Sequence, residues 1–198
     1  MSEMQRRMLA GELYIADDPV LQREQAHAQA LTERYNATPH AAAEERAAIL
    51  QELLGQVGDG VVIHPSFRCD YGSNISIGAG TFINFDCIML DVVAITIGAD
   101  CQIAPRVQLL TATHPIDPVA RREGWESADP ITIGDNVWLG GGVIVGPGVT
   151  IGDDTVVGAG AVVVRDLPNG VVAVGNPARV LREITEADRV ETPDRDDP

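Results

Sequence analysis

The sequence is poor in aromatic, basic and cysteine residues. Phe, Trp and Tyr make up 4% of the 198 residues, whereas there are 20 glycines. Such a composition suits a narrow core filled by Ile, Val and Leu rather than one built around large rings. The 14 basic residues are outnumbered by 29 acidic ones, which leaves a net charge of −15. This charge argues against nucleic acid as a partner, because neutralising phosphates requires a basic surface.

The three cysteines, Cys69, Cys87 and Cys101, form no CxxC pair. An odd number without such spacing does not indicate a disulfide framework, so we expect reduced thiols on the wall of the fold. The sequence also lacks a run of the roughly 18 apolar residues that span a bilayer. Its first 13 residues lack the apolar core and the cleavage site of a signal peptide. We therefore expect a cytoplasmic protein with no membrane partner.

A repeat with a period of six residues dominates the second half of the chain. Aliphatic residues recur at every sixth position, and each of the first five is followed by glycine, at Ile133, Leu139, Val145, Ile151, Val157 and Val163. This period is neither that of a helix nor that of an ordinary strand. Three such steps form one coil of about 18 residues in a parallel β-helix of the hexapeptide-repeat class, with the aliphatic side chains inside. The sequence thus predicts a mainly β protein.

The first part of the chain differs from this repeat. Residues 1–58 are rich in helix formers and predict a helical cap, with Asp18 as N-cap and Pro19 at the first position of a long helix. A second helix is expected to begin near Pro39. Such a cap would cover the apolar stacking face at the end of the coils.

Residues 59–175 are expected to form the β-helix, and residues 176–198 a short C-terminal helix and an acidic tail. Because a coil has about 18 residues, Cys69 and Cys87 are expected to stack on adjacent coils. Residues 110–130 contain three prolines and no repeat phase, so they must leave the coil as an ejected loop. A long loop on a rigid rod is the expected place for function.

Of the four histidines, only His114 lies in this loop. Imidazole can accept a proton near neutral pH, so a histidine on a projecting loop is a candidate general base. An exposed loop histidine without a chemical role is the alternative.

Several segments of the sequence resemble the maltose O-acetyltransferases. They are residues 10–14, 34–36, 67–91, 111–122 (TATHPIDPVARR), 131–142 and 174–179. The resemblance covers residues 4–184 and extends to the galactoside and nodulation-factor acetyltransferases, which use acetyl-CoA but differ in acceptor. It implies a left-handed coil, an exception to the usual right-handed crossover. It also implies a homotrimer with active sites between subunits, and acetyl-CoA and a sugar as small-molecule partners.

The resemblance implies roles for individual residues. His114 matches the catalytic base, which takes a proton from a sugar hydroxyl as the oxygen attacks the thioester of acetyl-CoA. The N–H of Gly141 matches the group that stabilises the oxyanion. The sugar would be bound by Asp70, Asn84 and Asp91, although the two aspartates could instead be corner residues of the coil.

A further set of positions matches the acetyl-CoA channel: Asn84, Trp138, Gly141, Ala159, Val164, Arg165, Arg179 and Arg182. Arginines suit the phosphates of CoA. Relatives commonly carry Thr-Lys where this chain has Val164 and Arg165, so the charge is kept and a hydroxyl is lost. For Trp138 a packing role is the alternative. The chemistry requires no metal.

We therefore expect an acetyl-CoA-dependent sugar O-acetyltransferase acting on maltose or glucose. The same chemistry on a galactoside, a chitin oligosaccharide or serine is one alternative, and a non-enzymatic β-helix scaffold is another. A zinc carbonic anhydrase of the same fold would need three converging histidines, whereas the coils offer only His64 and His114.

Overall fold

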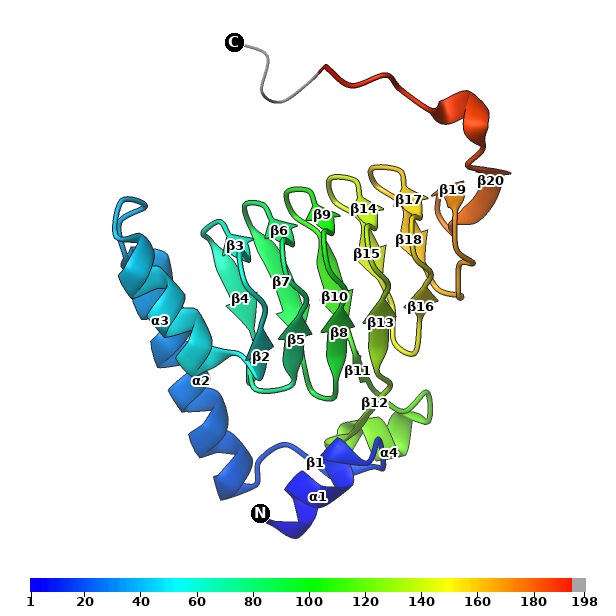
Figure 1. Cartoon of the computed structure of the whole chain (residues 1–198). Coiled ribbons are helices and arrows are strands. Elements are labelled where there is room, and N and C mark those ends of the chain that lie inside the picture. The colour runs from blue at the N-terminus through cyan, green and yellow to red at the C-terminus, as the bar shows by residue number, and fades with distance from the viewer. Residues whose placement is uncertain (194–198) are drawn as a thin grey trace.

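The computed structural model describes residues 1–193, and a three-sided solenoid makes up most of it (Figure 1). The first sheet contains β4 (Phe67–Cys69), β7 (Cys87–Leu90), β10 (Gln108–Leu110), β15 (Ile144–Val145) and β18 (Val162–Val163). The second contains β2 (Gln56–Val57), β5 (Ile75–Ile77), β8 (Ile95–Ile97), β13 (Ile131–Ile133) and β16 (Thr150–Ile151). The third contains β3 (Val62–Ile63), β6 (Phe82–Ile83), β9 (Gln102–Ile103), β14 (Trp138–Leu139), β17 (Val156–Val157), β19 (Val171–Val174) and β20 (Arg179–Glu183). The predicted β-helix is confirmed.

Inward-pointing residues of successive coils stack in columns. Ile97, for example, pairs with Ile77 on one side and with Ile133 on the other, and each of the three is 1% exposed. Full burial of such a side chain contributes roughly 1.5–3 kcal/mol. The repeated aliphatic position is therefore the source of the core.

Glycine follows the inward residue because the corners stack closely. A Cβ on Gly98 would lie 2.6 Å from the carbonyl oxygen of Gly134 in the next coil. A Cβ on Gly140 would lie 2.6 Å from the backbone nitrogen of Ala159. Both distances are well inside van der Waals contact, so the aliphatic-glycine pairs of the repeat reflect packing between corners.

The first coils are longer than the repeat predicts. Cys69 pairs with Met89, and Cys87 pairs with Phe67, so the expected stacking of Cys69 on Cys87 is wrong. The reason is that the passage from the first sheet to the second is two residues longer in these coils: the inward residues Cys69 and Ile77 are eight positions apart, whereas Val145 and Ile151 are six apart. All three cysteines are buried and reduced, as wall residues would be. Burial raises the pKa of the Cys69 thiol to about 12, which makes it a poor nucleophile.

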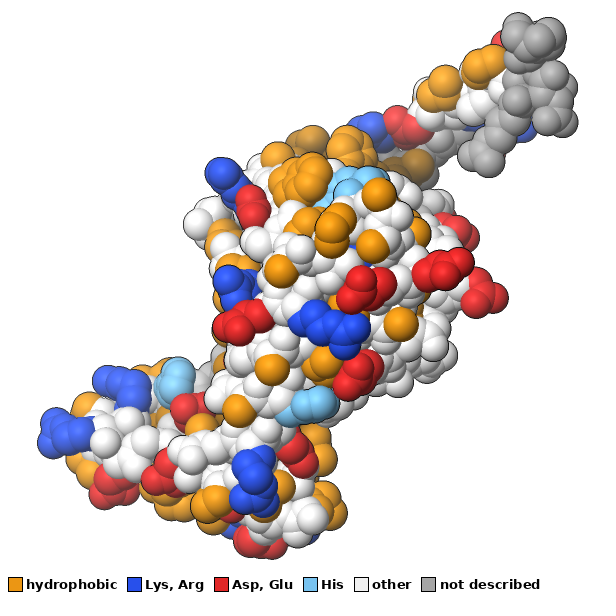
Figure 2. Space-filling model, turned by 90° about the vertical axis from the view of Figure 1, so that its left-hand side faces the viewer, with side chains coloured by type: hydrophobic (Ala, Val, Ile, Leu, Met, Phe, Trp, Pro, Cys, Tyr) orange, Lys and Arg blue, Asp and Glu red, His pale blue; other side chains and the backbone are white. Residues whose placement is uncertain are grey.

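Two helices close the N-terminal end of the solenoid. α2 (Pro19–Ala37) begins as predicted, because the Asp18 side chain accepts hydrogen bonds from two N–H groups of the first turn. α3 (Ala43–Leu53) begins four residues after Pro39. Figure 2 views this end from outside and shows acidic and basic side chains interspersed with small apolar patches. The cap thus turns an apolar stacking face into a mixed polar surface.

The expected C-terminal helix is largely replaced by a strand. β20 pairs antiparallel with β19, and the only helix after it in the described residues is one 3-10 turn, η1 (Glu186–Asp188). The open edge of β19 offers unpaired backbone groups, and this tertiary pairing overrides local helix propensity. Residues 194–198 of the expected acidic tail lie outside the described residues.

The ejected loop leaves the coil between β10 and β13 and carries its own small structure. It contains β11 (Ala112–Thr113), α4 (Pro118–Arg122) and β12 (Trp125–Ala128). β12 pairs antiparallel with β11 and also with β1 (Tyr14–Ile15), which follows α1 (Glu3–Leu9). This three-stranded sheet fastens the loop to the N-terminus of the chain (Figure 1).

A second hydrophobic cluster lies beneath this sheet, apart from the core of the solenoid. It consists of Met8, Tyr14, Leu21, Tyr71, Val92, Val93 and Ala128. Among residues 1–193, no helix has the length and apolar composition needed to cross a membrane.

Candidate active site

The chain reaches one corner of the prism in every coil as it passes from the first sheet to the second. The ejected loop departs there, so we call it the loop corner; it comprises residues 70–74, 91–94, 111–130, 146–149 and 164–166. Because these segments are equivalent positions of successive coils, they stack on one another. Asp70, Asp91 and the loop that carries His114 are brought together in this way.

Asp91 is fully buried and holds the loop corner together. One carboxylate oxygen accepts hydrogen bonds of 2.9 Å from the N–H groups of Asp70 and Tyr71, and the other accepts one of 3.2 Å from Asn74. Burial raises the pKa of the Asp91 carboxyl to about 6, and the backbone N–H groups act in the opposite direction. The carboxylate is thus engaged within the chain and fixes the backbone that carries Asp70.

Asp70 is half-buried beside two further polar groups that the sequence analysis did not single out. Burial raises the pKa of its carboxyl, the Gln25 side chain acts against this, and the nearby Glu126 carboxylate raises it further. Glu126 in turn accepts a 2.8 Å hydrogen bond from the hydroxyl of Tyr14. Tyr14 lies in residues 10–14, one of the segments that resemble the maltose O-acetyltransferases. That resemblance was the only signal in the sequence that pointed to Tyr14.

His114 is exposed and directly follows β11. In the ladder between β11 and β12, Thr113 pairs with Ser127, and their hydroxyls are 2.7 Å apart. His114 is the first residue after β11, and Glu126 is the residue of β12 next to Ser127, so the end of β11 brings the two residues near each other. Glu126 also pairs with Tyr14 across β12 and β1, so Tyr14, Glu126 and the strand end that carries His114 belong to one small sheet.

The corner between the third sheet and the first carries other predicted residues. We call it the Asn84 corner; it comprises residues 64–66, 84–86, 104–107, 140–143 and 158–161. Asn84 lines a hollow of about 130 Å³ together with Phe82, Gln102, Ile103, Ala104 and Trp138. Trp138 is 54% exposed, so it does not serve to fill the core of this chain.

Gly141 and Ala159 occupy the same Asn84 corner in successive coils. Gly160 donates a 2.9 Å backbone hydrogen bond to the Gly141 carbonyl. The N–H groups of Gly140 and Gly142 are also engaged between coils, whereas that of Gly141 has no backbone acceptor within the described residues. An N–H group left free in a fixed orientation is suited to stabilising a negative charge.

The remaining predicted residues lie nearer the C-terminus. Val164 and Arg165 are exposed at the loop corner, one sheet away from Gly141. Arg179 and Arg182 lie on β20, where Arg182 forms two 2.7 Å hydrogen bonds to the Asp188 carboxylate. The structure therefore divides the predicted residues of one chain among the loop corner, the Asn84 corner with the neighbouring Trp138, and β20.

The structure separates the two coil histidines. His64 lies at the Asn84 corner and packs against Phe82 and Phe85, with ring centroids 5.0 and 4.5 Å away. His114 belongs to the loop corner. Among residues 1–193, no three His, Cys, Asp or Glu side chains are grouped in a way that could hold a metal ion.

Comparison with known families and proteins gives consistent matches. Residues 7–58 match the maltose acetyltransferase hexapeptide capping motif, and residues 130–165 match the bacterial transferase hexapeptide (six repeats). Nodulation protein L of Rhizobium meliloti is 52% identical, over 88% of this chain and 95% of that protein.

Two solved structures have similar folds over almost their whole length. A maltose O-acetyltransferase from Clostridium difficile superposes with a TM-score of 0.92 at 48% identity, covering 93% of this chain and 99% of that one. A galactoside acetyltransferase in complex with coenzyme A superposes with a TM-score of 0.91 at 38% identity, covering 95% and 94%.

Proposed function

The chain belongs to the hexapeptide-repeat acetyltransferases that carry the maltose acetyltransferase cap, and we propose that it acetylates a sugar hydroxyl with His114 as general base. The acetyl donor is acetyl-CoA, since a related galactoside acetyltransferase binds coenzyme A. The acceptor is maltose or glucose, which fits the similarity to a maltose O-acetyltransferase. The observation that carries the proposal is the exposed imidazole of His114 beside the carboxylates of the loop corner.

The proposed reaction is a direct transfer. His114 takes the proton of the acceptor hydroxyl while the hydroxyl oxygen attacks the thioester carbonyl carbon of acetyl-CoA. The free N–H of Gly141 donates a hydrogen bond to the oxyanion of the tetrahedral intermediate. Collapse of this intermediate breaks the carbon-sulfur bond, and the CoA thiolate recovers the proton from the imidazolium. No covalent intermediate with the enzyme is needed, so positioning supplies much of the rate.

A hydroxyl-rich acceptor suits the polar groups on either side of this reaction. Asp70 and Glu126 offer carboxylate oxygens that accept hydrogen bonds from sugar hydroxyls. The side-chain oxygen of Asn84 accepts a 2.8 Å hydrogen bond from the N–H of Phe85, which leaves its amide N–H groups free to donate. Asp91 acts on the sugar indirectly in this scheme, because its carboxylate is occupied in holding the backbone of Asp70.

The donor side uses the arginines for the phosphates of CoA. Arg165 is exposed and has no ion-pair partner within the described residues, so it is ready for a phosphate. Arg182 would have to exchange Asp188 for the phosphate, whereas Arg179 donates only to a backbone carbonyl. Trp138, Ala159 and Val164 would line the channel for the pantetheine arm.

We propose a homotrimer whose active sites lie between subunits. Support comes from the separation of the loop corner, which carries His114, from the Asn84 corner, which lies on another edge of the same chain. The outward rows of the first and third sheets include apolar side chains, among them Ile88, Ile144, Val162, Val62, Phe82 and Trp138. The outward row of the second sheet is polar and consists of Gln56, Ser76, Thr96, Thr132 and Thr150. Packing the first sheet of one chain on the third sheet of the next is a heterologous contact that closes into a ring.

The test is CoA release by the purified protein with acetyl-CoA and, separately, maltose, glucose, a galactoside, chitin fragments, serine and no acceptor. Release that depends on maltose or glucose is expected. Release with serine alone would move the chain to another acceptor class with the same chemistry. A protein that releases no CoA with any acceptor would contradict the proposal.

A further inference from the structure

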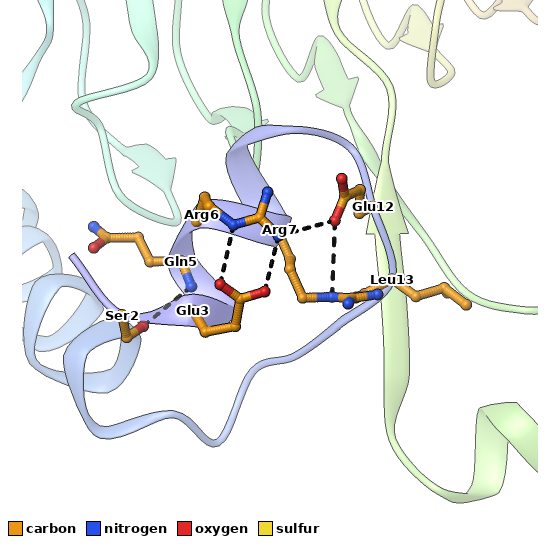
Figure 3. Close-up of polar contacts among 7 residues, drawn as sticks. All are labelled: Ser2, Glu3, Gln5, Arg6, Arg7, Glu12 and Leu13. Carbon is orange, nitrogen blue, oxygen red and sulfur yellow. Dashed lines mark hydrogen bonds and ion pairs between the residues drawn. The ribbon is translucent and has the colours of Figure 1, made fainter.

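The N-terminal segment forms ion pairs and hydrogen bonds within itself, before the chain reaches the ejected loop. We call residues 2–15 the strap. Arg6 of α1 forms a 2.8 Å ion pair with Glu3 and a 3.4 Å pair with Glu12, and Arg7 donates to the carbonyl of Leu13 (Figure 3). These contacts hold residues 12 and 13 of the strap against α1 and thereby set the position of the next residue, Tyr14.

The start of the strap is anchored to the cap as well. Ser2 caps α1, and its hydroxyl donates a 3.0 Å hydrogen bond to the Asp18 carboxylate, which is itself the N-cap of α2. Both ends of the strap are therefore fixed to rigid elements. Such a segment can hold another part of the molecule in place.

Tyr14 connects the strap to the loop. It is 1% exposed and packs in the cluster with Val92 and Ala128. The one hydrogen bond of its side chain within the described residues is the 2.8 Å bond that the hydroxyl donates to Glu126 Oε2. Burial and the Glu126 carboxylate both raise the pKa of Tyr14, so the hydroxyl keeps its proton and remains a donor. A buried hydroxyl without this partner would be unsatisfied, so the bond fixes both side chains.

The strand register carries this constraint to His114. Tyr14 pairs with Glu126 across β1 and β12, and the ladder between β12 and β11 ends at the neighbouring pair of Ser127 and Thr113, directly before His114. Tyr14 and Glu126 thus face each other across the sheet, and His114 begins where the strand beside Glu126 ends. Glu126 Oε1 accepts no hydrogen bond within the described residues, so this oxygen is free for another donor.

We propose that Tyr14 is a positioning residue for acetyl transfer, acting through Glu126 on the strand end at which His114 lies. This inference rests on the proposed function. Tyr14 touches neither substrate; its hydroxyl restrains the carboxylate next to the base. Losing this restraint should affect the step in which the proton is taken more than the binding of acetyl-CoA, whose phosphates are assigned to arginines nearer the C-terminus.

The test compares two tyrosines that lose only a hydroxyl. Tyr14→Phe should lower kcat on the order of tenfold, since small misplacements of a catalytic group are costly, and leave the KM for acetyl-CoA unchanged. The matched control is Tyr35→Phe. Tyr35 is also 1% exposed, and its hydroxyl donates to the carbonyl of Ile63 under the cap, away from the loop. This variant should lose thermal stability to a similar extent and keep its kcat.

A second comparison asks whether the effect passes through Glu126. In a Glu126→Ala background the bond is absent, so adding Tyr14→Phe should lower kcat no further. A full additional tenfold loss there would overturn the proposal. So would an unchanged kcat in Tyr14→Phe alone, or an equal loss in Tyr35→Phe. A wild-type protein without acetyl transfer would instead overturn the proposed function, and this proposal with it.

Discussion

Asn36 and Phe67 bind each other as two paired strands would. The Asn36 side-chain amide donates to the Phe67 carbonyl at 2.9 Å and accepts from the Phe67 N–H at 2.9 Å. Gln29, two helical turns earlier, donates to the Cys69 carbonyl at 2.7 Å. Amides on α2 thereby occupy the free edge of β4, which would otherwise be open to pairing with another chain.

Asn36→Ala should therefore destabilise the protein. It leaves the N–H and the carbonyl of the buried Phe67 without partners, at a cost of about 1–3 kcal/mol in unfolding free energy. Urea denaturation measures this, with Gln22→Ala, an exposed position on the same helix, as the control. Equal stability of the two variants would contradict the edge-covering role.

His114→Ala should fold and assemble as the wild type does, because the side chain is exposed. Loss of the general base should lower kcat by about 10²–10⁴-fold. The measurements are CoA release, circular dichroism and the oligomeric state in solution. Wild-type turnover by this variant would remove His114 from the mechanism.

Asp91 should make stability depend on pH. Burial raises the pKa of its carboxyl from the usual 3.8 to about 6, so the folded state binds a proton in this range that the unfolded state has released. The contribution of Asp91 to the unfolding free energy should thus fall as pH rises from 3.8 to about 6 and stay constant above that. From the shift between 3.8 and about 6, its size is about 3 kcal/mol.

Comparing the wild type with Asp91→Asn isolates this effect, since Asn does not titrate. The unfolding free energy of the wild type minus that of the variant should be larger at pH 5 than at pH 7.5. A difference that is independent of pH would show that the carboxyl titrates normally.

Gly98→Ala should destabilise the solenoid by about 1–3 kcal/mol, because the added methyl overpacks the corner. The matched control is Gly141→Ala, where the nearest atom to an added Cβ is the Pro105 carbonyl oxygen at 3.6 Å. The control also keeps its backbone N–H. Thermal unfolding should separate the two variants, and similar melting temperatures would contradict the stacking argument.

Arg165→Ala should raise the KM for acetyl-CoA with little change in kcat, as loss of a ground-state phosphate contact does. Arg182 should respond differently, because the Asp188 carboxylate competes for it. Its hydrogen bond lowers the pKa of Asp188 to about 2, so the pair is intact at neutral pH. Asp188→Asn should release Arg182 and lower the KM by about two- to fivefold, the scale of an exposed ion pair. A raised KM in Asp188→Asn would contradict this competition.

The repeat could be predicted because each step carries the same local signal. Ile133, Leu139 and Val145 are each followed by a glycine that marks a corner of the coil. Six such steps at constant spacing define which residues point inward. The start of the helix at Asp18 could be predicted as well, because an N-cap residue followed by proline is a signal contained within one helical turn.

The small sheet at the active site could not be predicted in the same way. Tyr14 and Glu126 are more than a hundred residues apart, and β1 has only two residues, too few for any periodicity. Residues 179–183 show the opposite difficulty, because their sequence suits a helix while the free edge of β19 pairs with them as a strand. The candidate site was therefore found where short motifs carry it, at His114, and missed where distant segments create it, at Glu126.

The coils before Ile133 are longer than those that follow, and the two halves of the rod therefore differ in how easily a coil could be added. Between Ile133 and Val163 the coils advance by 18 residues between equivalent strand positions, so an extra coil of that length could be inserted there without shifting a column. Before Ile133 additional contacts link neighbouring parts of the chain. Asp91 binds the backbone of the preceding corner, and β1 pairs with β12 of the ejected loop. An insertion there would part Tyr14 from Glu126. Length is thus adjustable in the C-terminal half of the rod and fixed in the half that holds His114.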